Sequence, residues 1–135
     1  MTVVIDASVI LKWVIPEADS EAADALLASE LIAPSLWISE SANALWRLTV
    51  QGTITKDVAS KLLNALRDAP VTSVEPDGDI DSALALATDL NHPLYDCLYL
   101  ALALRENTHV VTADKRFVAL ASKRAHLKGR VRALT

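Results

Sequence analysis

Residues 92–104 read HPLYDCLYLALAL, and this stretch decides the architecture of the chain. Every residue from 93 to 104 except Asp96 is apolar or a tyrosine, so the segment predicts a helix that is apolar on all sides. Such a helix belongs in the core. Asp96 must therefore face the core or a cleft, where an unpaired carboxylate costs several kcal/mol. The helix dipole contributes only about 0.3–1 kcal/mol, so Asp96 needs a bound cation or several hydrogen-bond donors.

Short β-rich runs alternate with helical segments on both sides of this stretch. The predicted strands are residues 2–5, 31–34, 71–76, 109–114 and 129–134. The predicted helices are residues 8–14, 19–30, 35–51, 55–68, 79–90, 95–107 and 115–125. Thr55 is a plausible N-cap, Pro34 suits the first turn of the helix after it, and Gly52 ends that helix.

This alternation predicts a three-layer α/β/α sandwich with a central parallel sheet of four to five strands. The 135 residues suit a single domain over residues 1–135. The sequence has no apolar run long enough for a membrane span, and MTVVIDASVILKW does not resemble a signal peptide. The single cysteine, Cys97, excludes an internal disulfide and favours the cytoplasm.

Charge is distributed unevenly along the chain. Residues 115–135 contain seven basic residues and no acidic one, which leaves six basic residues against all 17 acidic ones in residues 1–114, a formal charge of −11. A basic end beside an acidic body could bind a polyanion such as nucleic acid. A solvated basic face or a contact between copies of the chain explains the pattern equally well.

Two acidic residues follow predicted strands. Asp6 comes directly after TVVI, and Asp114 follows VVT with one alanine between. In parallel α/β sheets, ligands bind beyond the carboxyl ends of the strands, so these positions suit a functional site. Each residue also precedes a helical segment, so helix capping is an alternative for either one.

A third acid, Glu40, lies on the predicted helix 35–51. Glu40, Asn43 and Arg47 share one face of that helix and form a narrow polar stripe. The structural alternative is an ion pair between Glu40 and Arg47. Their separation of two helical turns is long for a direct pair.

Convergence of Asp6, Glu40, Asp96 and Asp114 at the strand ends would bring four mutually repelling carboxylates together. A divalent cation among them would make that arrangement favourable. An all-oxygen site selects Mg²⁺ or Mn²⁺, and such a site suits metal-assisted hydrolysis of phosphodiester bonds. The hydroxyls of Ser8 and Thr112 could contact water or phosphate, although such residues more often satisfy a local turn.

Other reactive side chains are given structural interpretations. Cys97 is expected in the core. The three histidines, His92, His109 and His126, are expected at the surface or at strand ends. Of the tryptophans, Trp37 and Trp46 are expected to pack in the interior, and Trp13 could line the groove or contact a partner protein.

Two alternative functions remain open at this point. A phosphatase or phosphotransfer domain would use Asp6 as its nucleophile, but Asp6-Ala7-Ser8 lacks a second aspartate and gives Glu40 no role. A non-catalytic module would use the acids only to bind a cation or a basic partner.

The segments VVIDASVILKW, PSLWISESANAL, HPLYDCLYLALAL and VVTADKRF occur in the order and spacing of PIN domains. The chain resembles most closely the VapC-type ribonuclease toxins of type II toxin–antitoxin modules, from Val3 to about Leu134. The resemblance implies a PIN-like sandwich and an Mg²⁺- or Mn²⁺-dependent endoribonuclease. A housekeeping PIN nuclease of RNA processing would have the same acids.

The resemblance also assigns roles to individual residues. It implies that Asp6 and Asp96 contact the metal directly, and that Glu40 and Asp114 complete the site directly, through water or by positioning the nucleophile. Ser8, Asn43 and Thr112 correspond to accessory positions. The implied partners are an RNA substrate, a homodimeric second copy and a VapB-like antitoxin whose C-terminal segment covers the groove.

Overall fold

The five strands form one parallel sheet in the computed structural model, which describes all residues from Met1 to Thr135. The strands are β1 (Thr2–Ile5), β2 (Glu30–Pro34), β3 (Val71–Val74), β4 (Val110–Thr112) and β5 (Val131–Ala133). Their spatial order is β3-β2-β1-β4-β5. The predicted parallel sheet is thus confirmed, with five strands.

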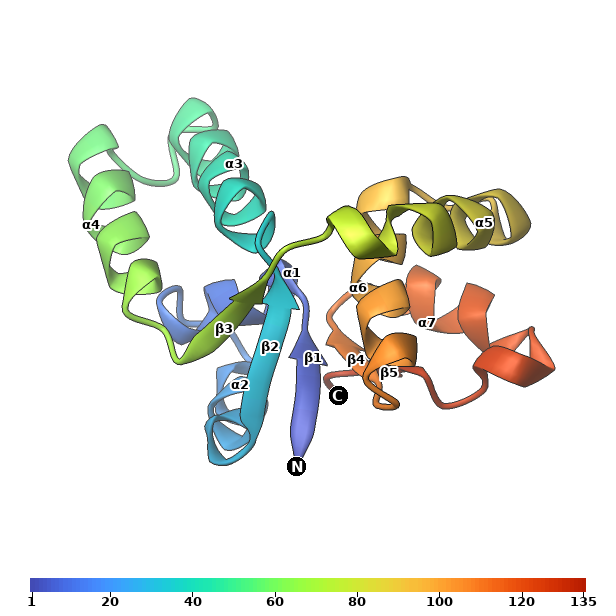
Figure 1. Cartoon of the computed structure of the whole chain (residues 1–135). Coiled ribbons are helices and arrows are strands. Elements are labelled where there is room, and N and C mark those ends of the chain that lie inside the picture. Colours follow the sequence, from blue (N-terminus) through green and yellow to red (C-terminus); the bar gives the residue numbers. More distant parts are fainter.

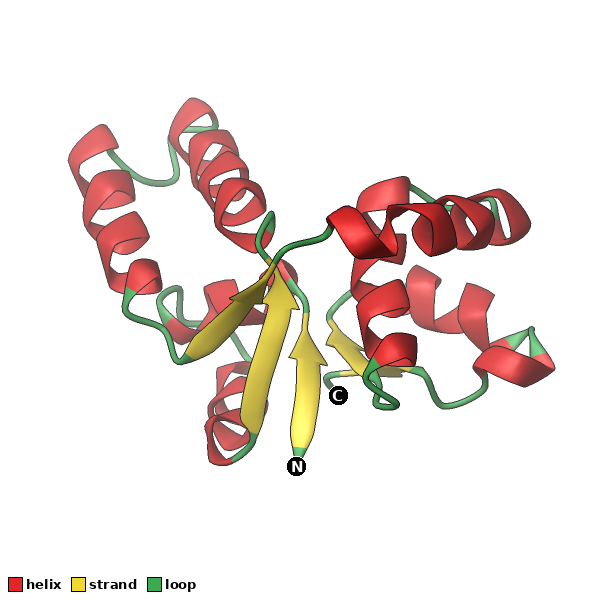
Figure 2. Ribbon diagram, viewed as in Figure 1, coloured by secondary structure: helices red, strands yellow, loops and turns green.

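Seven α-helices connect the strands. They are α1 (Ala7–Ile10), α2 (Ser20–Ala25), α3 (Trp37–Val50), α4 (Lys56–Arg67), α5 (Ile80–Leu90), α6 (Leu94–Arg105) and α7 (Lys115–Ser122). The helices α1 to α4 lie on one side of the sheet and α5 to α7 on the other (Figures 1 and 2). The predicted α/β/α layering is confirmed. No helix has the length and apolar character needed to cross a lipid bilayer.

The helices change from one side of the sheet to the other once, because the chain reverses its direction across the sheet. From β1 it moves outward to β2 and β3, and it then returns to β4 on the other side of β1 and continues to β5. Right-handed crossovers place the connecting helices on opposite faces for the two directions. The reversal lies between β1 and β4, which pair through Val4 with Val110 and Ile5 with Val111.

The apolar helix of the opening stretch is α6. Its residues from Cys97 to Ala103 are all buried, and α6 packs against β1, β2 and β4 on one side and against α5 on the other. Burial on several sides explains why α6 has no polar face. Asp96 precedes this buried run, in the first turn of the helix.

The predicted element boundaries hold to within a few residues, with one exception at Pro34. This residue is the last of β2 and pairs with Val74, so it does not lie in the first turn of the next helix. Ser35 and Leu36 make the turn, and α3 begins at Trp37. Thr55 caps α4 as predicted, its hydroxyl accepting a hydrogen bond from the amide of Val58. Gly52 follows α3 in a left-handed conformation, with φ of 78°.

Candidate active site

The site lies where the direction of the chain reverses across the sheet. The carboxyl ends of β1 and β4 are neighbours at one edge, and Asp6 directly follows β1. Asp114 lies two residues beyond the end of β4. The crevice at such a reversal is the usual ligand site of a doubly wound sheet, so the topology brings these two acids to one place.

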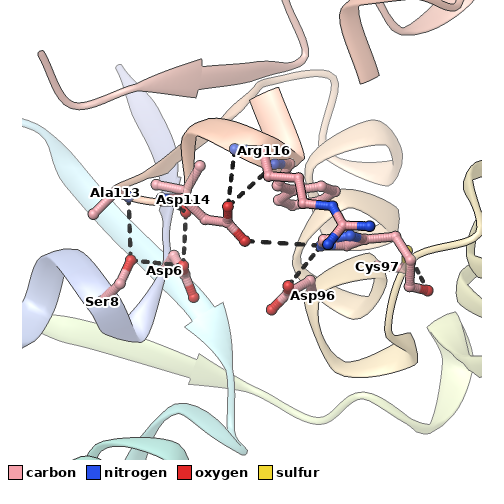
Figure 3. Close-up of polar contacts among 10 residues, drawn as sticks. Asp6, Ser8, Asp96, Cys97, Ala113, Asp114 and Arg116 are labelled. Carbon is pink, nitrogen blue, oxygen red and sulfur yellow. Dashed lines mark hydrogen bonds and ion pairs between the residues drawn. The ribbon is translucent and has the colours of Figure 1, made fainter. Parts of the chain in front are cut away.

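The Asp6 carboxylate is held by two hydroxyl groups. Its Oδ2 atom accepts hydrogen bonds from Ser8 Oγ at 2.7 Å and from Thr112 Oγ1 at 2.8 Å. Ser8 Oγ in turn accepts the amide N–H of Ala113 at 3.2 Å. These bonds tie the segment after β1 to the segment after β4 (Figure 3). The side chains of Ser8 and Thr112 therefore orient Asp6.

Asp114 caps α7 and also faces the site. Its Oδ1 atom accepts hydrogen bonds from the amides of Arg116 and Phe117 at 3.0 and 3.2 Å. Its own amide donates to Thr112 Oγ1 at 3.0 Å, and its Oδ2 atom lies 4.0 Å from Nε2 of His92. Capping and a role in the site are thus compatible, because each uses a different oxygen.

Asp96 has a partner that the sequence interpretation missed. Its Oδ2 atom lies 2.7 Å from Nε2 of His92, and its side chain is 26% exposed. The expectation that His92 is a surface or strand-end residue was wrong, because its side chain is only 6% exposed. Its ring stacks on Phe117 at a centroid distance of 4.7 Å. Asn91, in the left-handed conformation, ends α5 just before His92.

Together, His92, Asp96 and Asp114 offer three atoms that could bind a metal, all within 4.8 Å of one another. Figure 3 shows Asp6 and Asp114 on one side of a shared space and Asp96 on the other. A spacing of four residues separates His92 from Asp96. That spacing is the one signal by which the sequence could have indicated the pair.

Glu40 enters the site from α3, on the opposite face of the sheet from α6. Its Oε1 atom accepts a hydrogen bond of 2.5 Å from the hydroxyl of Tyr99, a residue that is 1% exposed. Burial raises the pKa of Glu40 to about 7, the hydrogen bond from Tyr99 opposes this rise, and the charges of Asp6 and Asp96 add to it. Arg47 makes no ion pair with Glu40, so that structural alternative is wrong.

The pKa of Asp6 is also raised. Burial is the largest cause, the hydrogen bonds from Ser8 and Thr112 oppose it, and the charge of Asp96 adds to it. Burial and the nearby charges of Glu40 and Asp6 likewise raise the pKa of the Tyr99 hydroxyl, so Tyr99 acts as a hydrogen-bond donor. The carboxylates of Asp6, Glu40 and Asp96 are thus close enough to disfavour one another's ionisation.

These donors fit a divalent cation. Four carboxylates converge from four different elements, and His92 is the only basic side chain within ion-pair distance of any of them. Carboxylate oxygens are the ligands that Mg²⁺ and Mn²⁺ prefer. A cation would offset the repulsion that raises the pKa values of Asp6 and Glu40.

A groove of about 350 Å³ adjoins Glu40. It is lined by Leu36, Ser39, Glu40, Asn43, Arg47 and Tyr95. Asn43 and Arg47 are exposed, and Tyr95, the neighbour of Asp96 on α6, is 62% exposed. The groove therefore offers an amide, a guanidinium group and an aromatic ring beside the acids.

Some of the remaining predictions for single residues are confirmed and others are wrong. Cys97 and Trp37 are buried, as predicted, and the indole of Trp37 donates to Ser73 Oγ. Trp46 is 59% exposed, so its predicted packing was wrong. Trp46 lines a groove between α3 and α4, where its side chain remains open to solvent. Trp13 packs against the core, donates to the carbonyl of Ala23, and is not among the residues that line the groove.

Comparisons with known proteins agree with this geometry. The family model for the PIN domain matches residues 3–123. Ribonuclease VapC3 of Pyrobaculum aerophilum is 32% identical over 120 residues, which cover 86% of this chain and 92% of that protein. The crystal structure of PAE2754 from Pyrobaculum aerophilum superposes with a TM-score of 0.74 at 23% identity, covering 99% of this chain and 84% of that one. At that identity, the structural likeness bears on the fold alone.

Proposed function

Because the chain belongs to the PIN domain family, we propose that it is a metal-dependent endoribonuclease and the toxin of a VapBC-type toxin–antitoxin pair. The observation that carries the proposal is the convergence of Asp6, Glu40, Asp96 and Asp114 at the reversal point of the sheet, with no lysine or arginine paired to them. The relative named a VapC ribonuclease supports RNA as the substrate.

In this proposal Asp6 and Asp96 bind Mg²⁺ or Mn²⁺ directly, and Glu40 and Asp114 complete the site. When bound, the cation makes a water molecule nucleophilic at neutral pH and offsets charge on the scissile phosphate. Ser8 and Thr112 fix the orientation of Asp6 through its Oδ2 atom. His92 fixes Asp96 in the same way, as partners of metal ligands commonly do.

Glu40 is the group that we assign to proton transfer. Tyr99 occupies its Oε1 atom, which leaves Oε2 to accept a proton from the attacking water. The pKa of Glu40, raised to about 7 by burial, is close to the value that suits a general base at neutral pH. Tyr99 holds the carboxylate in position through one short hydrogen bond.

The groove beside Glu40 is the proposed place for the nucleotide next to the scissile bond. Tyr95 offers an exposed ring on which a base could stack. Arg47 offers a guanidinium group with no acidic partner, suited to a backbone phosphate. Asn43 also lines the groove, and its side-chain amide can form hydrogen bonds with the nucleotide.

A protein partner is part of the same proposal. A second groove, of about 260 Å³, lies between α3 and α4 and is lined mainly by apolar residues, among them Leu45, Trp46 and Leu63. An exposed apolar groove of this kind suits a VapB-like antitoxin segment. We further propose a homodimer and a cytoplasmic location, with which the free thiol of Cys97 is compatible.

The test is RNA cleavage by the purified protein with Mg²⁺ or Mn²⁺, with and without a chelator. Asp6→Asn keeps a side-chain oxygen that can accept from Ser8 and Thr112, and it should abolish cleavage. Asp81→Asn is the matched control, because Asp81 is an exposed acid on α5 with no ion pair. Cleavage that survives both the chelator and Asp6→Asn would contradict the proposal.

Expression in a bacterial host tests the toxin assignment. Wild-type protein should arrest growth, Asp6→Asn should not, and co-expression of the adjacent antitoxin gene should restore growth. Metal-dependent cleavage without growth arrest would instead support a housekeeping PIN nuclease.

A further inference from the structure

A second cavity lies at the opposite end of the sheet from the acids. It has a volume of about 590 Å³ and is formed where β1 begins and where the chain enters β4 and β5. The residues that characterise it are Asn107, His109, Lys128, Arg130 and Arg132, with Glu106 at its border. Its volume lies within the range of about 300–1,000 Å³ that is usual for ligand sites.

The positive charge of this cavity is not balanced within the chain. Lys128, Arg130 and Arg132 take part in no ion pair, and the one acid of the lining, Glu106, is paired with Arg105 at 3.0 Å. His109 is buried beside them. Burial lowers the pKa of its imidazole, and the charges of Arg132 and Arg130 lower it further. The cavity thus concentrates three cations of the basic C-terminal segment.

Hydrogen bonds to two backbone carbonyls and to one side chain orient two of these cations. Arg130 donates from Nη1 to the carbonyl of Thr108 at 2.9 Å and from Nη2 to Oδ1 of Asn107 at 3.1 Å. Arg132 donates from Nε to the carbonyl of Gly129 at 3.0 Å, which leaves both of its terminal nitrogens free. Gly129 itself is in the left-handed conformation, with φ of 78°. Before any ligand binds, Arg130 is thus held by two hydrogen bonds and Arg132 by one.

We infer that this cavity, the basic pocket, is a second RNA-binding site that holds a backbone phosphate of the substrate away from the site of cleavage. Free guanidinium nitrogens match the paired oxygens of a phosphate. Nine of the ten lining residues are not hydrophobic, whereas the centre of a protein–protein interface is depleted in charged residues and more apolar. The chemistry of the pocket therefore favours a nucleic-acid phosphate over an acidic peptide.

The inference rests on the proposed ribonuclease function and adds a length requirement to it. The basic pocket lies at the amino ends of the strands and the acids at the carboxyl ends. At a rise of about 3.3 Å per residue, β1 alone separates the two ends by about 13 Å. An RNA that reaches both sites must also pass around the edge of the domain. The RNA must therefore extend by several nucleotides beyond the site of cleavage, or be folded, to reach both sites.

The experiment measures RNA binding rather than cleavage. The double variant Lys128→Ala/Arg132→Ala is made in the Asp96→Asn background, so that RNA stays intact, and Arg130 is kept because its hydrogen bonds support the loop. Binding of single-stranded RNAs of about 20 and about 5 nucleotides is followed by fluorescence anisotropy over a range of salt concentrations. The matched control is Lys61→Ala/Lys123→Ala, which removes two exposed lysines elsewhere.

We expect the double variant to bind the long RNA more weakly and to bind the short RNA as the parent does. Loss of the contact with the backbone phosphate in the basic pocket should reduce the slope of log affinity against log salt by about 0.7, the value per neutralised phosphate for single strands. The control should leave that slope unchanged for both RNAs.

Three results would overturn the inference: no change with the long RNA, an equal loss with both RNAs, or an equal loss in the control. Binding of polyglutamate that is lost in Lys128→Ala/Arg132→Ala, with RNA binding unchanged in that variant, would overturn it too, because the pocket would then bind an acidic protein. A wild-type protein that fails to cleave RNA while the length-dependent binding difference persists would contradict the proposed function and leave this site standing. Intact cleavage without that difference would do the reverse.

Discussion

The two ends of the sheet carry opposite charge, and the charges affect the stability of the fold differently. At the carboxyl ends, Asp6, Glu40 and Asp96 are close together, and burial and mutual repulsion raise the pKa values of Asp6 and Glu40. At the amino ends, Lys128 and Arg132 are exposed, and water screens their charges. One end is therefore unfavourable until a cation arrives, whereas the other costs little stability.

This difference assigns hydrolysis to the acidic end and the long-range attraction of RNA to the basic end. The acidic end repels a polyanion, so it can engage a phosphate only through a bound cation. The basic end attracts a polyanion at long range but offers no group suited to hydrolysis. A single strand connects them, since β1 begins beside the basic pocket and ends at Asp6. Changes at the two ends should accordingly have different consequences.

The largest expected effect is that of Asp96→Asn at the acidic end. Loss of a direct metal ligand should reduce the rate of RNA cleavage by roughly 10²–10³-fold, the range seen when one stabilising group for the transition state is removed. Stability should change little, because the amide oxygen of asparagine can still accept from His92 and Asp96 is partly exposed. Cleavage rates and thermal unfolding of the variant, beside Asp81→Asn, check both statements. A normal rate would contradict the site assignment.

The second effect is a dependence of stability on pH in metal-free protein. The pKa of Glu40 is about 7 in the folded state and 4.5 for the free side chain. Between these values the folded protein binds more protons than the unfolded one, so the free energy of unfolding should fall as pH rises from about 4.5 to 7. The full shift corresponds to between about 3 and 4 kcal/mol at about 1.36 kcal/mol per unit, and the fall should be smaller than this because Glu40 is partly exposed and water screens its interactions.

Glu40→Gln should remove most of that dependence, because glutamine can still accept the hydrogen bond from Tyr99 and carries no charge. Chemical denaturation at several pH values measures it, with Glu21→Gln as a control at an exposed glutamate. The raised pKa of Asp6 has the same sign and should leave a smaller residual slope. A variant with the same slope as wild type would show that Glu40 is not the group responsible.

The sequence predicted the positions of Asp6 and Asp114 well, because strand ends are a local property. The alternation of β-rich and helical runs places Asp6 and Asp114 at the ends of β1 and β4, and the topology of a parallel sheet brings such ends together. The apolar run of α6 likewise predicted its burial. Features that depend on the local sequence pattern, such as strand ends and the burial of α6, were therefore predictable.

What the sequence did not predict depends on how helices meet. Tyr99 and Glu40 are 59 residues apart, and their hydrogen bond depends on where α3 and α6 meet the sheet. The burial of His92 depends on its stacking against Phe117 of α7, and the exposure of Trp46 depends on how α3 meets α4 at the groove that Trp46 lines. The basic C-terminal segment indicated a polyanion partner. That it forms one cavity with Asn107 and His109 is visible only in the folded structure.

The third effect is stabilisation by the cation, which only the acidic end should show. At ten times its dissociation constant, Mg²⁺ or Mn²⁺ should raise the free energy of unfolding by about 1.4 kcal/mol. The gain should be larger at pH 8 than at pH 5, because metal binding needs deprotonated carboxylates. Thermal unfolding with and without metal measures it. Asp6→Asn should reduce the gain, and Lys128→Ala/Arg132→Ala should not; an equal gain in Asp6→Asn would contradict the proposed ligands.

The smallest effect separates the two ways of holding RNA. Tyr95→Ala should weaken binding of the short RNA by about fivefold, from the loss of roughly 1 kcal/mol of base stacking, and Tyr95→Phe should not. Since stacking involves no counterion release, the salt slope should stay the same, in contrast to the change expected at the basic pocket. Anisotropy titrations in the Asp96→Asn background compare the two. Two results would contradict base stacking in the groove beside Glu40. One is an unchanged affinity of Tyr95→Ala for the short RNA, and the other is a changed salt slope.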